Sequence, residues 1–211
     1  MKVTHVLWDF NGTILDDVEP CIKSINELLI GHGLKPLESV AEYQSVFGFP
    51  IKDYYERIGF DFTRFPYDEL AIEWVELYNR YNVPLRLCPR VKEALDAVKA
   101  AGLPQLILTA SSVDMVNSQL EGLGIGDYFE KIIGVDNIHA YGKIRIAREW
   151  MEAEKPGRAV LIGDSTHDSE VAAAIGADCV LVSCGHMSAQ KLAAYRPVYT
   201  DPFDAVKNIL E

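Results

Sequence analysis

The chain is expected to form an α/β protein, with a doubly wound, mostly parallel sheet and a smaller all-helical domain. From Pro84 onward, apolar strand-like runs alternate with helical patterns at short intervals, which is typical of a parallel sheet covered by helices. Three apolar runs lead directly to a polar side chain, at Asp9, Thr109 and Asp164. Between the first two runs, residues 17–81 break the alternation and have the pattern of several helices rich in tyrosine and phenylalanine.

The first elements of the core follow from apolar periodicity and from end signals. Residues 3–8 are the first strand, and the turn that follows contains small polar residues. After the helical segment, apolar residues at helical spacing predict a helix that ends at Gly102. The next strand runs to Thr109, Ser112 caps the following helix, and Gly124 ends it.

The second half of the core continues the same alternation. The expected elements are a strand at residues 131–135, a helix at about 142–154, a strand to 164, a helix ending near 176, a strand at 179–184, and helices near 188–195 and 203–210. No long structureless gap interrupts them, as expected for one compact core.

The helical segment is predicted to be an inserted domain of residues 17–81, so the core consists of residues 1–16 and 82–211. Turn signals divide the insert at residues 31–33, 48–50 and 65–66. In an open parallel sheet, ligands bind beyond the carboxyl ends of the strands, where the strand order reverses. Because the insert leaves the core soon after Asp9 and returns before the next strand, we expect it to act as a lid above that crevice.

Composition limits the classes of partner. With 211 residues, 49% of them hydrophobic, the chain can bury a proper core. A formal net charge of −11 disfavours nucleic acid and anionic membranes, and it requires local cations at any site for an anionic substrate. No apolar stretch approaches the roughly 20 residues of a membrane span, and no signal-peptide core precedes Asp9, so we expect a cytoplasmic protein. The sequence indicates no oligomeric state.

Cysteines and histidines show no pattern of a metal centre. The four cysteines have neither a paired zinc-ligand spacing nor the density of a disulfide scaffold, so we expect reduced thiols. Structural roles are expected for four histidines that share no ligand spacing: His5, His32, His139 and His186.

The polar residues near the strand ends form four motifs. They are Asp9-Phe10-Asn11-Gly12-Thr13, Thr109, Lys143 and Gly163-Asp164-Ser165-Thr166-His167-Asp168. In this order and spacing they resemble the four signatures of the haloacid dehalogenase-like superfamily, and the insert resembles the helical cap of its phosphoglycolate-phosphatase-like members. The resemblance covers the whole chain. It implies a Rossmann-like core and a magnesium-dependent phosphatase that hydrolyses small phosphorylated metabolites through a phosphoaspartate.

Asp9 is the predicted nucleophile. A carboxylate can attack phosphorus and form an acyl phosphate, which splits one difficult displacement into two easier ones. An aspartate after a buried strand can instead cap a helix or a turn. Gly12 favours a turn in which backbone amides approach a phosphate closely, so Gly12 and Thr13 are predicted to bind the substrate.

A magnesium site is expected beside the nucleophile. Two carboxylates and a backbone carbonyl form the hard oxygen site that Mg²⁺ prefers. Asp9, the carbonyl group of Asn11 and Asp164 would supply it, and Asp168 would orient a metal-bound water. The alternative is that Asp164 and Asp168 are stabilising acids at a helix start.

Thr109 and Lys143 are predicted to hold the phosphoryl group. The Thr109 hydroxyl and the amides that follow it, beginning at Ala110, can donate to a phosphoryl oxygen, although a capping or turn role is the alternative. The resemblance assigns Lys143 to neutralising the phosphate and the nucleophile. An isolated lysine at a helix start is otherwise a surface charge, but the helix dipole disfavours it there, which suggests a non-structural reason.

The insert offers candidates for substrate contact. Phe49 and Pro50 lie in a predicted loop and are expected to touch the substrate. Four other aromatic residues could line the crevice or form the core of the insert: Tyr43, Phe47, Tyr54 and Tyr55. Asp17, where the chain leaves the core, could cap a helix, contact substrate or be solvated, and capping is favoured.

Asn11 departs from the pattern of the superfamily's phosphatases. In them this position is an aspartate that protonates the leaving group and then deprotonates the attacking water. An amide cannot exchange a proton near neutral pH, and a general acid/base contributes about 10²–10⁴-fold. We therefore expect slow turnover of ordinary phosphate monoesters.

Three explanations for Asn11 stay open. The substrate has a good leaving group, His167 replaces the missing acid, or Asn11 deamidates in part of the sample. Two other functions also stay open. One is a phosphonatase-like enzyme with a Schiff base at Lys52, although Lys52 lies one residue away from the position expected for the Schiff-base lysine of such enzymes. The other is a catalytically weak module that binds a phosphorylated ligand or accepts phosphate at Asp9.

Overall fold

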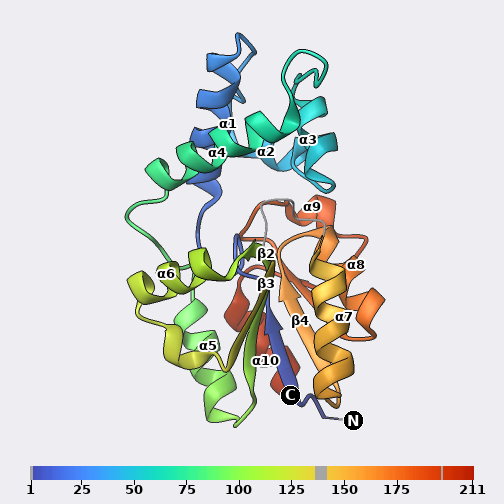
Figure 1. Cartoon of the computed structure of the whole chain (residues 1–211). Helices are drawn as coiled ribbons and strands as arrows, with labels where there is room; N and C mark the ends of the chain where they lie inside the picture. Colours follow the sequence, from blue (N-terminus) through green and yellow to red (C-terminus); the bar gives the residue numbers. More distant parts are fainter. Residues whose placement is uncertain (1, 136–141, 196) are drawn as a thin grey trace.

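The computed structural model contains one parallel sheet with helices on both faces and a group of helices above the carboxyl ends of its strands (Figure 1). It describes residues 2–135, 142–195 and 197–211, so His139 lies outside the described residues. The strands are β1 (His5–Trp8), β2 (Gln105–Ser112), β3 (Lys131–Val135), β4 (Ala159–Gly163), β5 (Asp178–Val182) and β6 (Val198–Tyr199).

The sheet has the order β3-β2-β1-β4-β5-β6, and every neighbouring pair is parallel. The chain adds β2 and β3 on one side of β1 and β4 to β6 on the other, so the strand order reverses beside β1. This arrangement confirms the doubly wound α/β fold. Three details differ from expectation: the strand predicted at residues 179–184 ends at Val182, the strand predicted to end at Thr109 continues to Ser112, and the two-residue β6 was not predicted.

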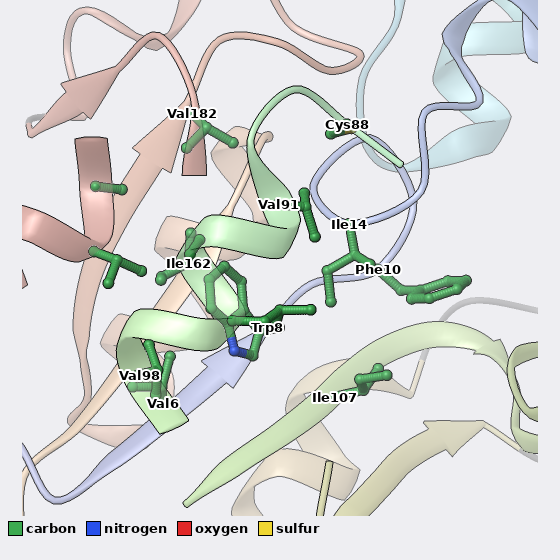
Figure 2. Packing of buried hydrophobic residues seen from close by; sticks show 14 of the residues in the cluster. Val6, Trp8, Phe10, Ile14, Cys88, Val91, Val98, Ile107, Ile162 and Val182 are labelled. Carbon is green, nitrogen blue, oxygen red and sulfur yellow. The ribbon is translucent and has the colours of Figure 1, made fainter. Parts of the chain in front are cut away.

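Both faces of the sheet are buried. Alternate strand residues point to opposite faces, so Val6 and Trp8 belong to one hydrophobic cluster and Leu7 belongs to the other. Figure 2 shows the first cluster, in which the buried Trp8 also donates its ring N–H to the Gln105 side chain at 3.1 Å. The first face is covered by α5 (Val91–Ala100), α6 (Val113–Leu123) and α10 (Pro202–Leu210), and the second by α7 (Lys143–Glu154) and α8 (Thr166–Ile175).

Two short helical elements complete the core. A 3-10 turn, η1 (Gly126–Tyr128), precedes β3, and α9 (Ala189–Leu192) follows β5. The helix predicted near residues 188–195 is therefore much shorter than expected, although Ser188 caps it by accepting the Lys191 backbone N–H at 3.3 Å.

The helices above the sheet are α1 (Val18–Gly31), α2 (Val40–Val46), α3 (Ile51–Arg57) and α4 (Tyr67–Tyr81), which we call the cap helices. The three predicted turn regions fall between them or at their ends. Their buried side chains form a hydrophobic cluster of their own, as an inserted domain would need. The domain boundaries at residues 17 and 81 stay a prediction. No helix within the described ranges is both long and apolar enough to cross a membrane.

Candidate active site

The reversal of strand order brings three of the predicted residues together. Asp9 follows β1, Asp164 follows the adjacent β4, and Thr109 lies in β2 on the other side of β1. The backbone N–H of Asp9 donates to the Ile162 carbonyl at 2.8 Å, which extends the pairing of β1 with β4 to the nucleophile candidate. All three residues line one cavity of about 270 Å³ between the sheet and the cap helices.

Lys143 lies at the centre of the site rather than on the surface. It is the first residue of α7 and is only 3% exposed. Its Nζ donates to Asp9 Oδ1 at 2.5 Å and to Asp168 Oδ1 at 2.6 Å. Burial disfavours its charge, but the two carboxylates outweigh burial and raise the pKa of Lys143. This position excludes the alternative of a solvated surface lysine.

Asp168 has the structural role considered for it at a helix start, and in the site it pairs with Lys143. That Asp168 orients a metal-bound water stays a prediction. Its Oδ2 accepts the Ser165 backbone N–H at 3.0 Å and the Ser165 hydroxyl at 2.7 Å, which forms a capping box at α8. Its Oδ1 holds Lys143. Burial would raise the pKa of Asp168, but the Lys143 charge outweighs burial and lowers it. A capped helix end therefore fixes the carboxylate that orients the lysine.

Three carboxylates form a candidate cation site. Single oxygen atoms of Asp9, Asp164 and Asp168 all lie within 4.8 Å of one another, and Asp164 Oδ2 accepts the His186 backbone N–H at 2.5 Å. Burial raises the pKa of Asp164 to about 6, and burial together with the Asp168 charge raises the pKa of Asp9. Three buried acids with a single lysine leave excess negative charge, and their hard oxygen donors fit magnesium.

Glycines allow the close approach of these groups. Gly12 has φ +74°, and a Cβ built there would lie 2.4 Å from Asp164 Oδ2. A Cβ at Gly185 would lie 2.2 Å from the same oxygen. The turn after β1 and the loop after β5 therefore pack against Asp164 in a way that no larger residue permits.

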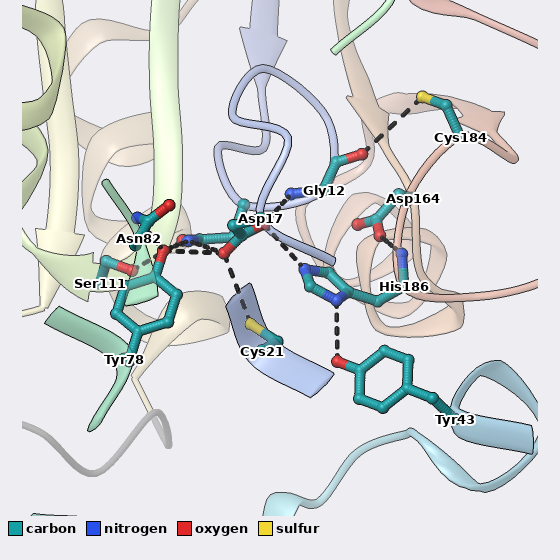
Figure 3. A network of polar contacts seen from close by, with 12 residues as sticks. Gly12, Asp17, Cys21, Tyr43, Tyr78, Asn82, Ser111, Asp164, Cys184 and His186 are labelled. Carbon is teal, nitrogen blue, oxygen red and sulfur yellow. Dashed lines mark hydrogen bonds and ion pairs between the residues drawn. The ribbon is translucent and has the colours of Figure 1, made fainter. Parts of the chain in front are cut away.

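Asn11 takes part in the hydrogen-bond network around Asp17. Figure 3 shows Asp17 with its partners Gly12, Tyr78 and His186. The Asn11 amide Nδ2 donates to Asp17 Oδ2 at 2.7 Å and to the Tyr78 hydroxyl oxygen at 3.1 Å. Its Oδ1 accepts the Ser111 hydroxyl at 2.9 Å. The side chain uses both of its donor hydrogens and its acceptor, so its contacts match an amide and not a carboxylate.

An ion pair between Asp17 and His186 was not predicted. Asp17 precedes α1 but makes no capping bond with its side chain, so the expectation of a cap was wrong. Asp17 Oδ1 instead accepts the Gly12 backbone N–H at 2.9 Å and lies 3.1 Å from His186 Nε2. His186 Nδ1 lies 2.9 Å from the Tyr43 hydroxyl oxygen.

The two partners favour each other's charge. Burial opposes the protonation of His186, but the Asp17 carboxylate outweighs burial and raises the pKa of His186 to about 9. Burial likewise opposes the charge of Asp17, and His186 outweighs it and lowers the pKa of Asp17. Both residues line the cavity. One signal could have found His186: it follows β5, the next strand in the sheet, as Asp164 follows β4.

The other predicted residues occupy different positions. Ala110 and Phe49 line the cavity, whereas Pro50 lines an adjoining hollow together with Lys143. Thr13 is fully buried and is not among the residues that line the cavity. Four further aromatic residues of the insert line the cavity as expected for a crevice, although three of them are also buried in the cap cluster: Tyr43, Phe47, Tyr54 and Tyr55.

His167 and Lys52, which were considered as a substitute acid and as a Schiff-base lysine, lie in different positions relative to the cavity. His167 lines the cavity and stacks on Phe49 with ring centroids 4.7 Å apart, and its Nδ1 lies 3.1 Å from Glu170 Oε2. Lys52 is exposed, lies over the Tyr67 ring with its Nζ 4.8 Å from the centroid, and does not line the cavity. The position of Lys52 outside the cavity lining therefore gives no support to a Schiff base beside Asp9.

Comparison with known proteins agrees with this geometry. The model of a family described as haloacid dehalogenase-like hydrolase matches residues 6–182. The pyrophosphatase PpaX of Bacillus velezensis is 26% identical over 220 residues, which covers 94% of this chain and 91% of that protein. The phosphoglycolate phosphatase of Yersinia pseudotuberculosis is 28% identical over 204 residues, which covers 92% of this chain and 87% of that protein.

A solved structure supports the fold independently. It is a hydrolase described as a haloacid dehalogenase-like family protein from Streptococcus pneumoniae, and it has a TM-score of 0.77 at 18% identity, covering 98% of each chain. At this level of identity the likeness concerns the fold alone.

Proposed function

The chain belongs to the haloacid dehalogenase-like hydrolase family, and on that premise we propose that it is a magnesium-dependent phosphatase of small phosphorylated molecules that uses Asp9 as nucleophile. One observation carries the proposal: the buried Lys143 bridges Asp9 and Asp168, and Asp164 lies beside them at the point where the strand order reverses. A buried lysine among three carboxylates serves no packing purpose, because apolar residues would fill the space at lower cost.

The first step forms a bond from Asp9 to phosphorus. Lys143 holds Asp9 Oδ1 at 2.5 Å, which leaves Oδ2 as the attacking oxygen. As the new P–O bond forms, the ester P–O bond breaks and the leaving oxygen keeps its electron pair. Thr109 and the backbone amides after it stabilise the charge that develops on the phosphoryl oxygens. A magnesium ion held by Asp9, Asp164 and the carbonyl group of Asn11, with Asp168 beside it, would supply positive charge for the same oxygens.

The second step regenerates the enzyme. Water attacks the phosphorus of the phosphoaspartate, the bond to Asp9 breaks, and inorganic phosphate leaves. Asn11 cannot remove a proton from that water, and its amide is instead fixed by Asp17 and Ser111. We therefore propose that Asn11 orients groups in the site and that proton transfer goes to solvent, which makes turnover slow for poor leaving groups.

The test is magnesium-dependent release of phosphate from a panel of monoesters and acyl phosphates. Asp9→Asn abolishes release, whereas Asp127→Asn, a substitution at an exposed residue outside the site, leaves it unchanged. Rapid acid quenching followed by peptide mass analysis is expected to find one phosphoryl group on the peptide that contains Asp9. Phosphate release that persists in Asp9→Asn would refute the proposed nucleophile.

The alternative of a module that only binds or accepts phosphate gives a different result. Such a module would bind phosphorylated ligands, or gain a lasting phosphoryl group at Asp9, without releasing phosphate repeatedly. The relatives named above are called phosphatases, which favours the enzyme. Their names specify pyrophosphate and phosphoglycolate, and both compounds carry a second anionic group beside the phosphoryl group that is transferred.

A further inference from the structure

The upper part of the active-site cavity is aromatic and apolar. It is lined by side chains from α3, α4, α6 and the loop between α2 and α3, and we call this part the aromatic chamber: Phe47, Phe49, Tyr54, Trp74 and Met115. The Trp74 ring stacks on Tyr78 with centroids 5.0 Å apart, and the Tyr78 hydroxyl contacts Asn11. The chamber is therefore continuous with the position of the missing general acid.

The described residues that line the cavity offer no unpaired lysine or arginine to a second anionic group. Among these described residues, four are carboxylates and Lys143 is the one lysine or arginine. Lys143 is already held by two carboxylates, and His186 is paired with Asp17. A carboxylate or second phosphate on the leaving group would thus enter a space with aromatic walls and find no unpaired lysine or arginine among the described lining residues, which is unfavourable.

Asn11 adds an independent requirement. Because the amide cannot donate a proton to the leaving oxygen, the leaving group must depart as an anion. A phenol such as that of tyrosine has a pKa of about 10, whereas water has a pKa of about 15.7 and alkyl alcohols resemble it. An aryl oxide is therefore a far better unprotonated leaving group than an alkoxide.

Size agrees with one ring. The cavity of about 270 Å³ must hold the phosphoryl group and whatever is attached to it. An apolar cavity of roughly 150 Å³ is large enough to bind benzene in another protein. The cavity therefore has room for the phosphoryl group and a single aromatic ring.

We propose that the substrate class is a monoaryl phosphate, with the phosphoryl group beside Asp9 and an uncharged aromatic ring in the aromatic chamber. The inference rests on the proposed phosphatase function, because it names the substrate class of that site. It joins two features of the chain that otherwise have no connection, namely an amide at position 11 and a chamber with aromatic walls. A ring that stacks in the chamber fixes the leaving oxygen, and the low pKa of that oxygen replaces the missing acid.

Binding of phosphonates tests the inference without dependence on turnover. In the presence of magnesium, phenylphosphonate is expected to bind at least about tenfold more tightly than ethylphosphonate, and phosphonoacetate is expected to bind no better than ethylphosphonate. Isothermal titration calorimetry and quenching of tryptophan fluorescence measure the three affinities on the unaltered chain. Equal affinities for the three ligands, or a preference for phosphonoacetate, would overturn the inference.

A matched pair of variants locates the ring. Ala71 lines the cavity from α4, and Ala71→Phe is expected to fill the chamber, weakening phenylphosphonate about tenfold and changing ethylphosphonate less than about twofold. Ile72 is the next residue of α4 and is 54% exposed, so Ile72→Phe adds the same ring away from the cavity and changes neither affinity. If Ala71→Phe does not fold, the three phosphonates on the unaltered chain decide by themselves.

The outcomes separate this inference from the proposed function. Magnesium-dependent turnover of monoesters without preferential binding of phenylphosphonate leaves the phosphatase standing and refutes the aryl substrate class. Preferential binding of phenylphosphonate without turnover of any monoester leaves the aryl ligand class standing and refutes the phosphatase.

Discussion

Replacing Asn11 by aspartate tests how the site is built around an amide. In a site that simply lacks its general acid, Asn11→Asp would restore it and raise the rate by the full factor of about 10²–10⁴. In this structure the new carboxylate would face another one, because Asn11 Nδ2 lies 2.7 Å from Asp17 Oδ2. The substitution also removes the donor that Asp17 now uses.

The size of the effect follows from the distance. At 2.7 Å and an effective dielectric constant of about 20, two unit charges repel each other by roughly 6 kcal/mol. This energy corresponds to about 4 pKa units, so residues 11 and 17 would share one proton near neutral pH and titrate as a pair. The new acid would be held by Asp17 rather than delivered to the leaving group.

The assay is kcat/KM with magnesium for ethyl phosphate, a poor leaving group, and phenyl phosphate, a good one. Asn11→Asp alone is expected to raise the value for ethyl phosphate less than about tenfold. Adding Asp17→Asn removes the opposing charge, and the double variant is expected to gain at least about 100-fold on ethyl phosphate. Asp17→Asn alone serves as the control and gains nothing, and phenyl phosphate changes little in every variant.

Stability gives a second measurement. In Asn11→Asp, the carboxyl groups at positions 11 and 17 would share one proton, so their pKa in the folded protein lies above the unfolded value. The variant therefore tolerates both groups at low pH, and they destabilise the fold as pH rises through the folded-state pKa. The melting temperature of Asn11→Asp, relative to that of the unaltered chain, is expected to fall with rising pH. A full gain in rate from Asn11→Asp alone, with no change in melting temperature, would refute the reasoning.

Three further substitutions give expected outcomes by differential scanning fluorimetry and phosphate release. Asp17 raises the pKa of His186 to about 9, above its unfolded value of about 6.5. Protonated His186 therefore stabilises the fold fully below a pH of about 6.5, and this stabilisation is lost as pH rises through about 9. His186→Gln is expected to destabilise the fold by up to about 3 kcal/mol at low pH and by less as pH rises over that range. Gly12→Ala lowers the melting temperature more than Gly102→Ala, since both residues have positive φ but a Cβ has space only at Gly102. Lys143→Met abolishes phosphate release because two buried carboxylates lose their cation, and a variant that keeps activity would contradict its assigned role.

The fold could be predicted because its long elements carry periodic patterns. Helices such as α5 and α6 show repeated apolar positions and recognisable ends, and buried parallel strands form continuous apolar runs. The two-residue β6 and the four-residue α9 are too short to contain a period. Their positions depend on pairing with β5 and on packing in the tertiary structure, which no local pattern records.

The site could be predicted where a strand points its last residue at the crevice. Asp9 and Asp164 directly follow β1 and β4, and Thr109 lies near the carboxyl end of β2, whereas the assignment of Lys143 depended on the family resemblance. The position of His186 after β5 could have marked it as a candidate, but its pairing with Asp17 could not be predicted, because the two residues are 169 positions apart and each has a common local explanation. Thr13 lies in the first motif, but its side chain is fully buried, since a motif specifies a turn and not the direction of every side chain in it.

The network around Asn11 also bears on why the position is an amide. The Tyr78 hydroxyl donates to Asp17 at 2.8 Å and accepts hydrogen bonds from the amides of Asn11 and Asn82. Each donor in this series of hydrogen bonds therefore faces an acceptor. Deamidation of Asn11 would turn a donor to Asp17 into a second acceptor and break the match. The structure therefore disfavours deamidation as the source of the missing acid. A leaving group that needs no proton fits the same contacts without altering any of them, and it agrees with the aromatic chamber above.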